Sequence, residues 1–111
     1  MRLLAVADIH GAQYRLNLVL KNITIYTPDL VIVCGDITQF GPGELARNFL
    51  NQIPIRTLAV PGNIDSFDVD QGIAASKATN LHQKQVTIDK IPFLGIGREI
   101  PSNLSTLPIE D

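Results

Sequence analysis

Four polar side chains with metal-binding chemistry follow three short apolar runs of the sequence. Asp8 and His10 come directly after the first run, Asp36 follows the second, and Asn63 follows the third. Carboxylate oxygens, an imidazole nitrogen and an amide oxygen together suit a divalent transition metal such as Mn, Fe, Zn, Ni or Co. Asp8, His10, Asp36 and Asn63 are therefore the candidate metal ligands and the candidate catalytic residues.

The spacing of these residues matches the period of a strand-helix-strand repeat. Asp8 and Asp36 are 28 positions apart, and Asp36 and Asn63 are 27. In an open parallel sheet such repeats return the chain to one edge, outside the carboxyl ends of the strands, where ligands bind. A backbone turn at Ile9 would let Asp8 and His10 reach the same ion.

Two ions at this edge, about 3.5–4 Å apart, would bind a phosphate, activate a water and stabilise the leaving oxygen. One carboxylate has to bridge two such ions. Asp36 lies on the middle run and is the predicted bridge.

Apolar patterns indicate the elements that would position these ligands. Continuous apolar runs at residues 3–7, 30–34 and 55–60 predict three buried strands. Apolar residues that recur with helical spacing predict helices over residues 13–22 and 44–52. The runs are apolar enough to be covered on both faces, which predicts an α/β fold with a parallel βαβαβ sheet flanked by helices.

The pattern weakens after the third run. Residues 69–78 predict a short helix, and residues 85–88 and 91–96 predict a C-terminal hairpin with a tight turn. We expect residues 97–111 to form an irregular tail. The length of 111 residues fits a single domain over residues 1–111.

Composition excludes several classes of protein. Nine Lys and Arg residues against 11 Asp and Glu residues give a net charge of −2, without a basic run. This balance gives no electrostatic footprint for nucleic acid. No apolar run has the length of a membrane span or of a signal peptide's apolar region.

The chain has one cysteine, Cys34, which cannot form an internal disulfide. A reducing cytoplasm is the simplest location for such a protein. Its place at the end of an apolar run, before Gly35, favours a small buried hydrophobic residue.

Three short motifs in the order DIH (8–10), GDIT (35–38) and GNID (62–65) resemble motifs one to three of the calcineurin-like metallophosphoesterases. The hairpin that ends in FLGIGREIP is also similar to the family's segment after motif three, so the resemblance runs to about residue 97. It implies half of the family's α/β sandwich and a small-molecule phosphoester substrate.

The resemblance also implies a role for each candidate ligand. Asp8 and His10 would bind one ion, Asp36 would bridge, and Asn63 would bind the second ion. A hydroxide held between the ions would attack phosphorus in line. The first ion would keep three protein ligands and the second would keep two.

The chain departs from the family pattern at motif three. Ile64 stands where the family usually has a histidine that orients the phosphate and is often taken as the acid for the leaving group. Isoleucine cannot donate a proton, so the departure favours phosphodiesters or activated esters as substrates.

The family's two later histidine motifs, Gly-His and Gly-His-x-His, are also missing. His10 and His82 are the only histidines of the chain. We therefore expect a truncated domain whose exposed sheet edge favours a homo-oligomer.

The missing histidines equally fit a non-catalytic protein-binding module on the same fold. Some relatives, including a subunit of the endosomal retromer coat, use the scaffold mainly in this way. A receiver-like signalling domain fits least, because it needs an acidic pair after the first strand and the segment Asp8-Ile9-His10 supplies one acid.

Structural roles also remain open for single residues. Asp8 or Asp36 alone could end a strand and cap the following helix. Asp65 could be a helix cap or a partner that orients the metal ligands.

Overall fold

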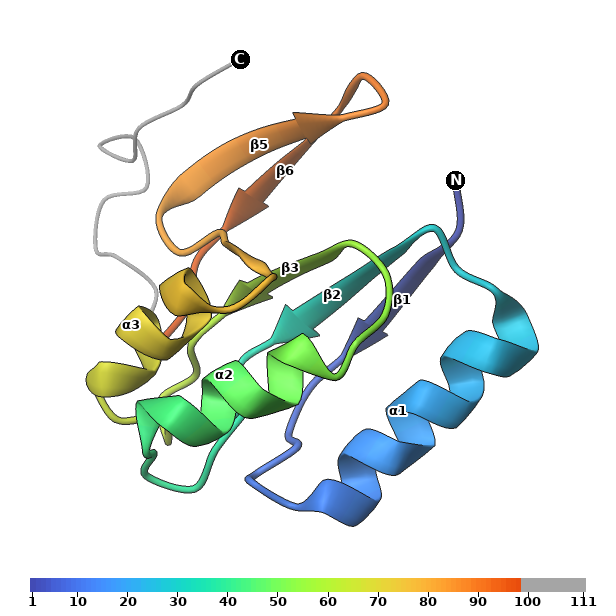
Figure 1. Ribbon diagram of the computed structural model, residues 1–111. Coiled ribbons are helices and arrows are strands. Elements are labelled where there is room, and N and C mark those ends of the chain that lie inside the picture. Colours follow the sequence, from blue (N-terminus) through green and yellow to red (C-terminus); the bar gives the residue numbers. More distant parts are fainter. Residues whose placement is uncertain (99–111) are drawn as a thin grey trace.

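A sheet of four parallel strands forms the centre of the computed structural model, which describes residues 1–98 (Figure 1). The strands follow the chain order across the sheet: β1 (Leu3–Val6), β2 (Leu30–Cys34), β3 (Thr57–Val60) and β4 (Thr79–Asn80). Because the strands are parallel, their carboxyl ends meet at one edge. The predicted parallel α/β fold is confirmed; β4 was not predicted, because two polar residues carry no apolar pattern.

The helices of residues 1–98 all pack against one face of this sheet (Figure 1). They are α1 (Gln13–Tyr26), α2 (Gly43–Asn51) and α3 (Asp68–Ala75). Right-handed crossovers between sequential strands that advance in one direction place the helices on one side. In the described part of the chain, no helix has the length and apolarity needed to cross a membrane.

Helix α1 is longer than predicted. It ends at Thr27, which has a left-handed backbone with φ of 43° and donates its N–H to the carbonyl of Ile23. Such a residue satisfies a free carbonyl at the helix end, and Pro28 then prevents continuation.

The opposite face of the sheet carries the predicted hairpin, formed by β5 (Lys84–Ile88) and β6 (Ile91–Gly95). Asp89 and Lys90 at its tip both have positive φ, 51° and 66°. This conformation is the one that two-residue hairpin turns require, because its twist matches that of the strands.

The prediction that every strand is covered on both faces was wrong. The hairpin forms a second core with β2 and β3, which contains Leu30, Leu58, Leu81 and Ile88. Strand β1 is an edge strand outside this core, and Leu3 is 49% exposed. The apolar run at residues 3–7 therefore forms a strand that is buried on the helix side alone.

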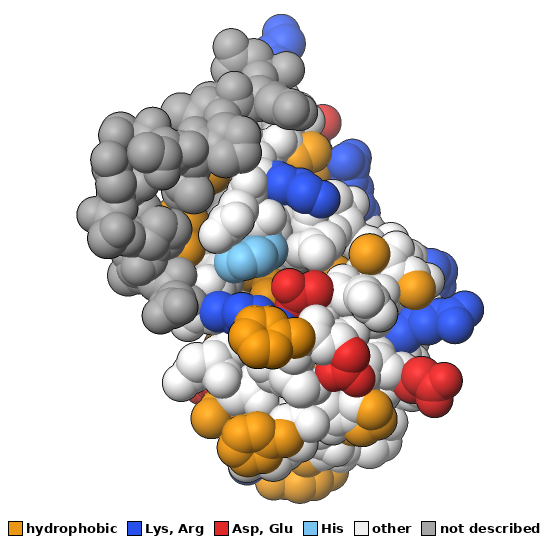
Figure 2. All heavy atoms as spheres, turned by 90° about the vertical axis from the view of Figure 1, so that its left-hand side faces the viewer, with side chains coloured by type: hydrophobic (Ala, Val, Ile, Leu, Met, Phe, Trp, Pro, Cys, Tyr) orange, Lys and Arg blue, Asp and Glu red, His pale blue; other side chains and the backbone are white. Residues whose placement is uncertain are grey.

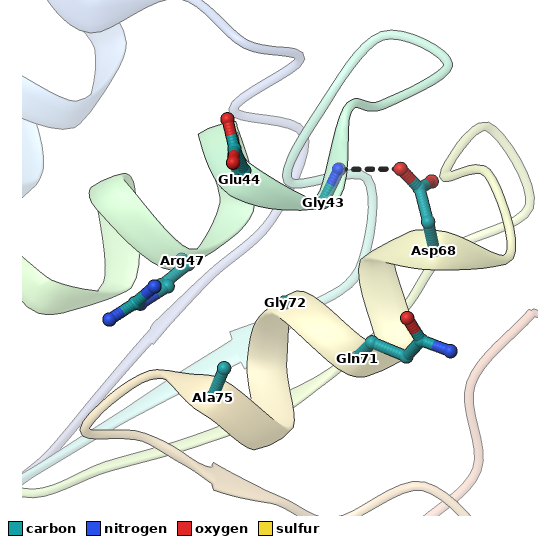
Figure 3. Close-up of a pocket in the computed structure, with 7 residues that line it drawn as sticks. All are labelled: Gly43, Glu44, Arg47, Asp68, Gln71, Gly72 and Ala75. Carbon is teal, nitrogen blue, oxygen red and sulfur yellow. Dashed lines mark hydrogen bonds between the residues drawn. The ribbon is translucent and has the colours of Figure 1, made fainter.

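Helices α2 and α3 approach each other through glycines (Figure 3). A Cβ atom at Gly72 would lie 2.1 Å from the carbonyl oxygen of Gly43, so a larger residue cannot fit. Pro42 precedes α2 and has no side-chain acceptor to offer its first N–H groups. Asp68 of α3 takes this role by accepting the N–H of Gly43 at 2.8 Å.

The pKa of Asp68 lies below its usual range because its carboxylate accepts hydrogen bonds from the Ser66 hydroxyl and from the Gly43 N–H. A lowered folded-state pKa adds stability above the unfolded-state pKa, and this stability is lost as the pH falls through the folded-state pKa. We expect Asp68→Asn to lower the melting temperature at neutral pH and to match the unmodified chain in strong acid. Thermal unfolding followed by circular dichroism across pH measures this difference.

Asp89→Asn in the hairpin turn serves as the control, and we expect it to show no such pH-dependent loss. A deficit of Asp68→Asn that stays equal at every pH would contradict the role given to the Asp68 charge.

Candidate metal centre

Asp8, His10 and Asp36 lie together at the carboxyl edge of the sheet. One possible ligand atom of each residue lies within 4.8 Å of the others. Nε2 of His10 is 3.5 Å from Oδ1 of Asp8. The loops after β1 and β2, which are far apart in the sequence, thus bring three of the four candidate ligands into one group.

The backbone of this group is left-handed at each candidate ligand. Asp8, His10 and Asp36 have φ angles of 61°, 51° and 52°. This conformation costs about 1–3 kcal/mol for a residue other than glycine, and it clusters at functional sites. The predicted turn at Ile9 was wrong: Ile9 is 2% exposed and anchored in the core, so the chain turns at the residues on either side of it.

Backbone hydrogen bonds hold the first loop against the second. The N–H of His10 donates to the carbonyl of Asp36 at 2.9 Å, and the N–H of Gly11 donates to that of Ile37 at 2.8 Å. The pairing of β1 with β2 therefore continues into the loops, which limits the relative movement of Asp8, His10 and Asp36.

Asn63 reaches the same edge from the third loop. It lines a cavity of about 210 Å³ together with Asp36, Gly62 and Arg98. The N–H of Ile64 donates to Oδ1 of Asp36 at 3.0 Å. Asp36 thus belongs both to the three-residue group and to the cavity that contains Asn63.

Gly62 makes this arrangement possible. A Cβ atom at Gly62 would lie 2.0 Å from Oδ1 of Asp36. The close approach of the second and third loops therefore requires glycine at this position.

A family model described as calcineurin-like phosphoesterase matches residues 1–108. The chain belongs to this family. The uncharacterized protein MJ1162 of Methanocaldococcus jannaschii is 32% identical over 99 residues, which cover 87% of the phosphoesterase chain and 43% of that relative.

The fold of the phosphoesterase chain resembles the crystal structure of TT1561 of Thermus thermophilus. The TM-score is 0.71 at 18% identity, over 90% of this chain and 50% of that chain. The chain spans about half the length of these two proteins. At this level of identity the similarity concerns the fold.

The donor set of the phosphoesterase fits a divalent metal. Among residues 1–98, Nδ1 of His10 is buried without a hydrogen-bond partner. The distance of 3.5 Å from Nε2 to Asp8 is long for a hydrogen bond. An imidazole left free in this way, beside two carboxylates, is available as a ligand for metals that bind nitrogen and oxygen.

Asp65 joins the second and third loops and is not a helix cap. Its side chain is buried at 3% exposure. The carboxylate accepts the N–H groups of Ile37, Thr38 and Gly62 and the hydroxyl of Thr38, at 2.7–3.1 Å. Asp65 therefore acts on the candidate ligands through the backbone on either side of them.

Two further side chains near the centre differ from expectation or from its chemistry. Cys34 is exposed and lines the cavity, so the interpretation as a buried residue was wrong. Nearby atoms still exclude water from part of the thiol, and this desolvation raises its pKa. His82 lies apart from the group, because its Nδ1 accepts the N–H of Gly97 at 2.9 Å.

Arg98 was not recognised as a residue of this region from the sequence. It lines the cavity beside Asp36 and Asn63. A lone arginine after a predicted strand carries no spacing signal, and the predicted irregular tail at residues 97–111 lies almost wholly outside the described residues.

Proposed function

We propose that this phosphoesterase domain hydrolyses phosphodiesters with two divalent ions held at the carboxyl edge of its sheet. The single observation that carries the proposal is the group of Asp8, His10 and Asp36, whose possible ligand atoms lie within 4.8 Å of one another. Membership of the calcineurin-like phosphoesterase family supports the reaction class.

The proposed roles follow the chemistry of each side chain. Asp8, His10 and Asp36 would hold the first ion, and Asp36 and Asn63 would hold the second. When bound, two such ions neutralise phosphate oxygens and lower the pKa of a water. The chain itself keeps Asp36 in place through the Ile64 N–H and limits motion of the loops through Asp65.

The proposed preference for diesters rests on residue 64. Ile64 lies next to Asp36 but has no proton to give to a leaving group. A leaving group that is stable as an anion, such as an aryl oxide, needs less proton donation than an alkoxide. Activated diesters therefore fit this site better than alkyl monoesters.

An assay of the purified chain with added Mn²⁺ or Ni²⁺ tests the proposed function. We expect an aryl phosphodiester to be hydrolysed faster than the corresponding monoester, and chelation of the metal to stop both reactions. Equal or reversed rates would remove the argument for diesters, and the absence of metal-dependent hydrolysis would remove the proposed activity.

A second candidate function is a non-catalytic protein-binding module. The observation in its favour is the exposed apolar surface on the hairpin side, where Leu3 and Leu94 are each 49% exposed. This surface would also serve a homo-oligomer through the β1 edge. Metal titration separates the candidates, because a binding module needs no tight metal site and no carboxylate at Asp36.

The compartment remains a proposal from one residue type. A single exposed cysteine, Cys34, suits a reducing cytoplasm, in which thiols stay reduced.

A further inference from the structure

Arg98 lies where the end of the hairpin meets the loop that carries Asn63. Its N–H donates to the carbonyl of Pro61 at 2.8 Å. Its guanidinium donates through Nη1 to the carbonyl of Asp65 at 2.6 Å and through Nη2 to that of Ser66 at 3.0 Å. One residue thus holds the backbone of the third loop on both sides of Asn63.

The remaining contacts of the guanidinium keep it in this place. Nη2 forms an ion pair with Asp70, and Cζ lies 4.7 Å from the centre of the Phe67 ring. The side chain of Arg98 is 15% exposed, whereas Phe67 is 84% exposed. Figure 2 shows a face of the molecule on which basic, acidic, histidine and hydrophobic side chains lie side by side.

The third loop is clamped from two directions through Asp65. Arg98 holds its carbonyl oxygen, and the N–H groups of Ile37 and Thr38 hold its carboxylate. The adjacent residue, Ile64, donates its N–H to Asp36. The position of Asn63 relative to Asp36 therefore depends on both clamps.

We propose that Arg98 is a positioning residue that fixes residues 61–66, so that Asn63 and Asp36 can hold one divalent ion between them. The inference rests on the proposed two-ion function. Asn63 and Asp36 would be the only protein ligands that the proposal gives to this second ion, so a small displacement of the loop removes a large share of its binding.

The sign of the effect distinguishes positioning from charge. Arg98 is a cation beside a cation site, so by Coulomb's law alone its removal would strengthen metal binding. Positioning predicts the opposite result. Outer residues that orient metal ligands typically change metal affinity about 10–100-fold.

Three variants separate the contacts. Arg98→Gln removes the charge and shortens the donor, whereas Arg98→Lys keeps the charge but replaces the planar pair of donors by one ammonium. Asp70→Asn removes the ion pair and leaves the two carbonyl contacts in place. We expect both Arg98 variants to weaken the second ion about 10-fold or more and to leave the first ion within about twofold, while Asp70→Asn binds both ions normally.

Two measurements on the whole chain read out these changes. Calorimetric titration with Mn²⁺ gives the number and affinity of bound ions, and circular dichroism checks that each variant is folded. Amide hydrogen exchange of the metal-free chain reports the loop directly, and we expect the Gly62, Ile64 and Asp65 amides to exchange about tenfold faster in the Arg98 variants. If Arg98→Gln does not fold, Arg98→Lys carries the test.

Unchanged or tighter binding of the second ion in the Arg98 variants would overturn the inference, and so would unchanged exchange in the third loop. Rescue by lysine would assign the effect to charge and would also overturn it. A single bound ion in the unmodified chain would instead refute the two-ion function on which the inference depends. Two ions in the unmodified chain, with normal binding in the Arg98 variants, would refute the role of Arg98 alone.

Discussion

Replacing Asp36 by asparagine is expected to lower metal-dependent phosphodiester hydrolysis by at least about a thousandfold. Asp36 is the one carboxylate that lies in the group with Asp8 and His10 and also lines the cavity with Asn63. Its loss would weaken both proposed ion sites. Metal ions supply several kcal/mol of transition-state stabilisation in such reactions, and each 1.36 kcal/mol corresponds to about a factor of ten in rate.

The variant is well matched to the question. Asparagine retains an oxygen that can accept the Ile64 N–H, so the contact between the second and third loops can survive. Asp89→Asn, in the hairpin turn, controls for the loss of one carboxylate elsewhere. The measurements are kcat and KM with an aryl phosphodiester, together with the number of Mn²⁺ ions bound; full activity with one or two ions bound would exclude Asp36 from the centre.

Replacing Ile64 by histidine is expected to raise hydrolysis of an alkyl phosphomonoester about 10²-fold, with little change for an aryl diester. A positioned general acid contributes about 10²–10⁴-fold when the leaving group needs a proton. The backbone of residue 64 contacts Asp36, so a side chain at this position starts beside the proposed centre. An aryl oxide gains less, because it leaves as a stable anion.

The pH dependence gives a second readout of the same variant. A histidine acid must be protonated, so the gained activity should fall as the pH rises through about 6.5, the usual pKa of histidine. Ile64→Gln adds a polar side chain without an acid and should show no gain. A gain that is equal in the histidine and glutamine variants would assign the effect to polarity and would contradict the role given to residue 64.

Much of the frame that carries the candidate centre could be predicted from local patterns. The apolar runs that became β2 and β3 and the helical stripes of α1 and α2 each depend on contacts with a buried layer, and such periodicity is visible in one sequence. The intervals of 28 and 27 residues between the candidate ligands then implied one edge of a sheet. The hairpin turn at Asp89 and Lys90 was equally local.

Coverage of the sheet could not be predicted in the same way. An apolar strand reads alike whether a second layer packs on one face or on two, so the exposure of Leu3 on the β1 edge had no signal in the chain. The same holds for Cys34, which ends an apolar strand yet lies at the cavity. Strand β4 depends on pairing with β3, and its two residues have no pattern of their own.

By itself, the sequence determined which side chains could bind metal and that three of them would meet at one edge, because strand-helix-strand spacing is a repeated local property. The tertiary structure decided how the loops behind them are held. The left-handed backbone at Asp8 and His10 follows from Ile9 being anchored in the core. The clamps made by Asp65 and Arg98 join residues about 30 positions apart, and such contacts form after the layers have packed, so no single segment of the sequence encodes them.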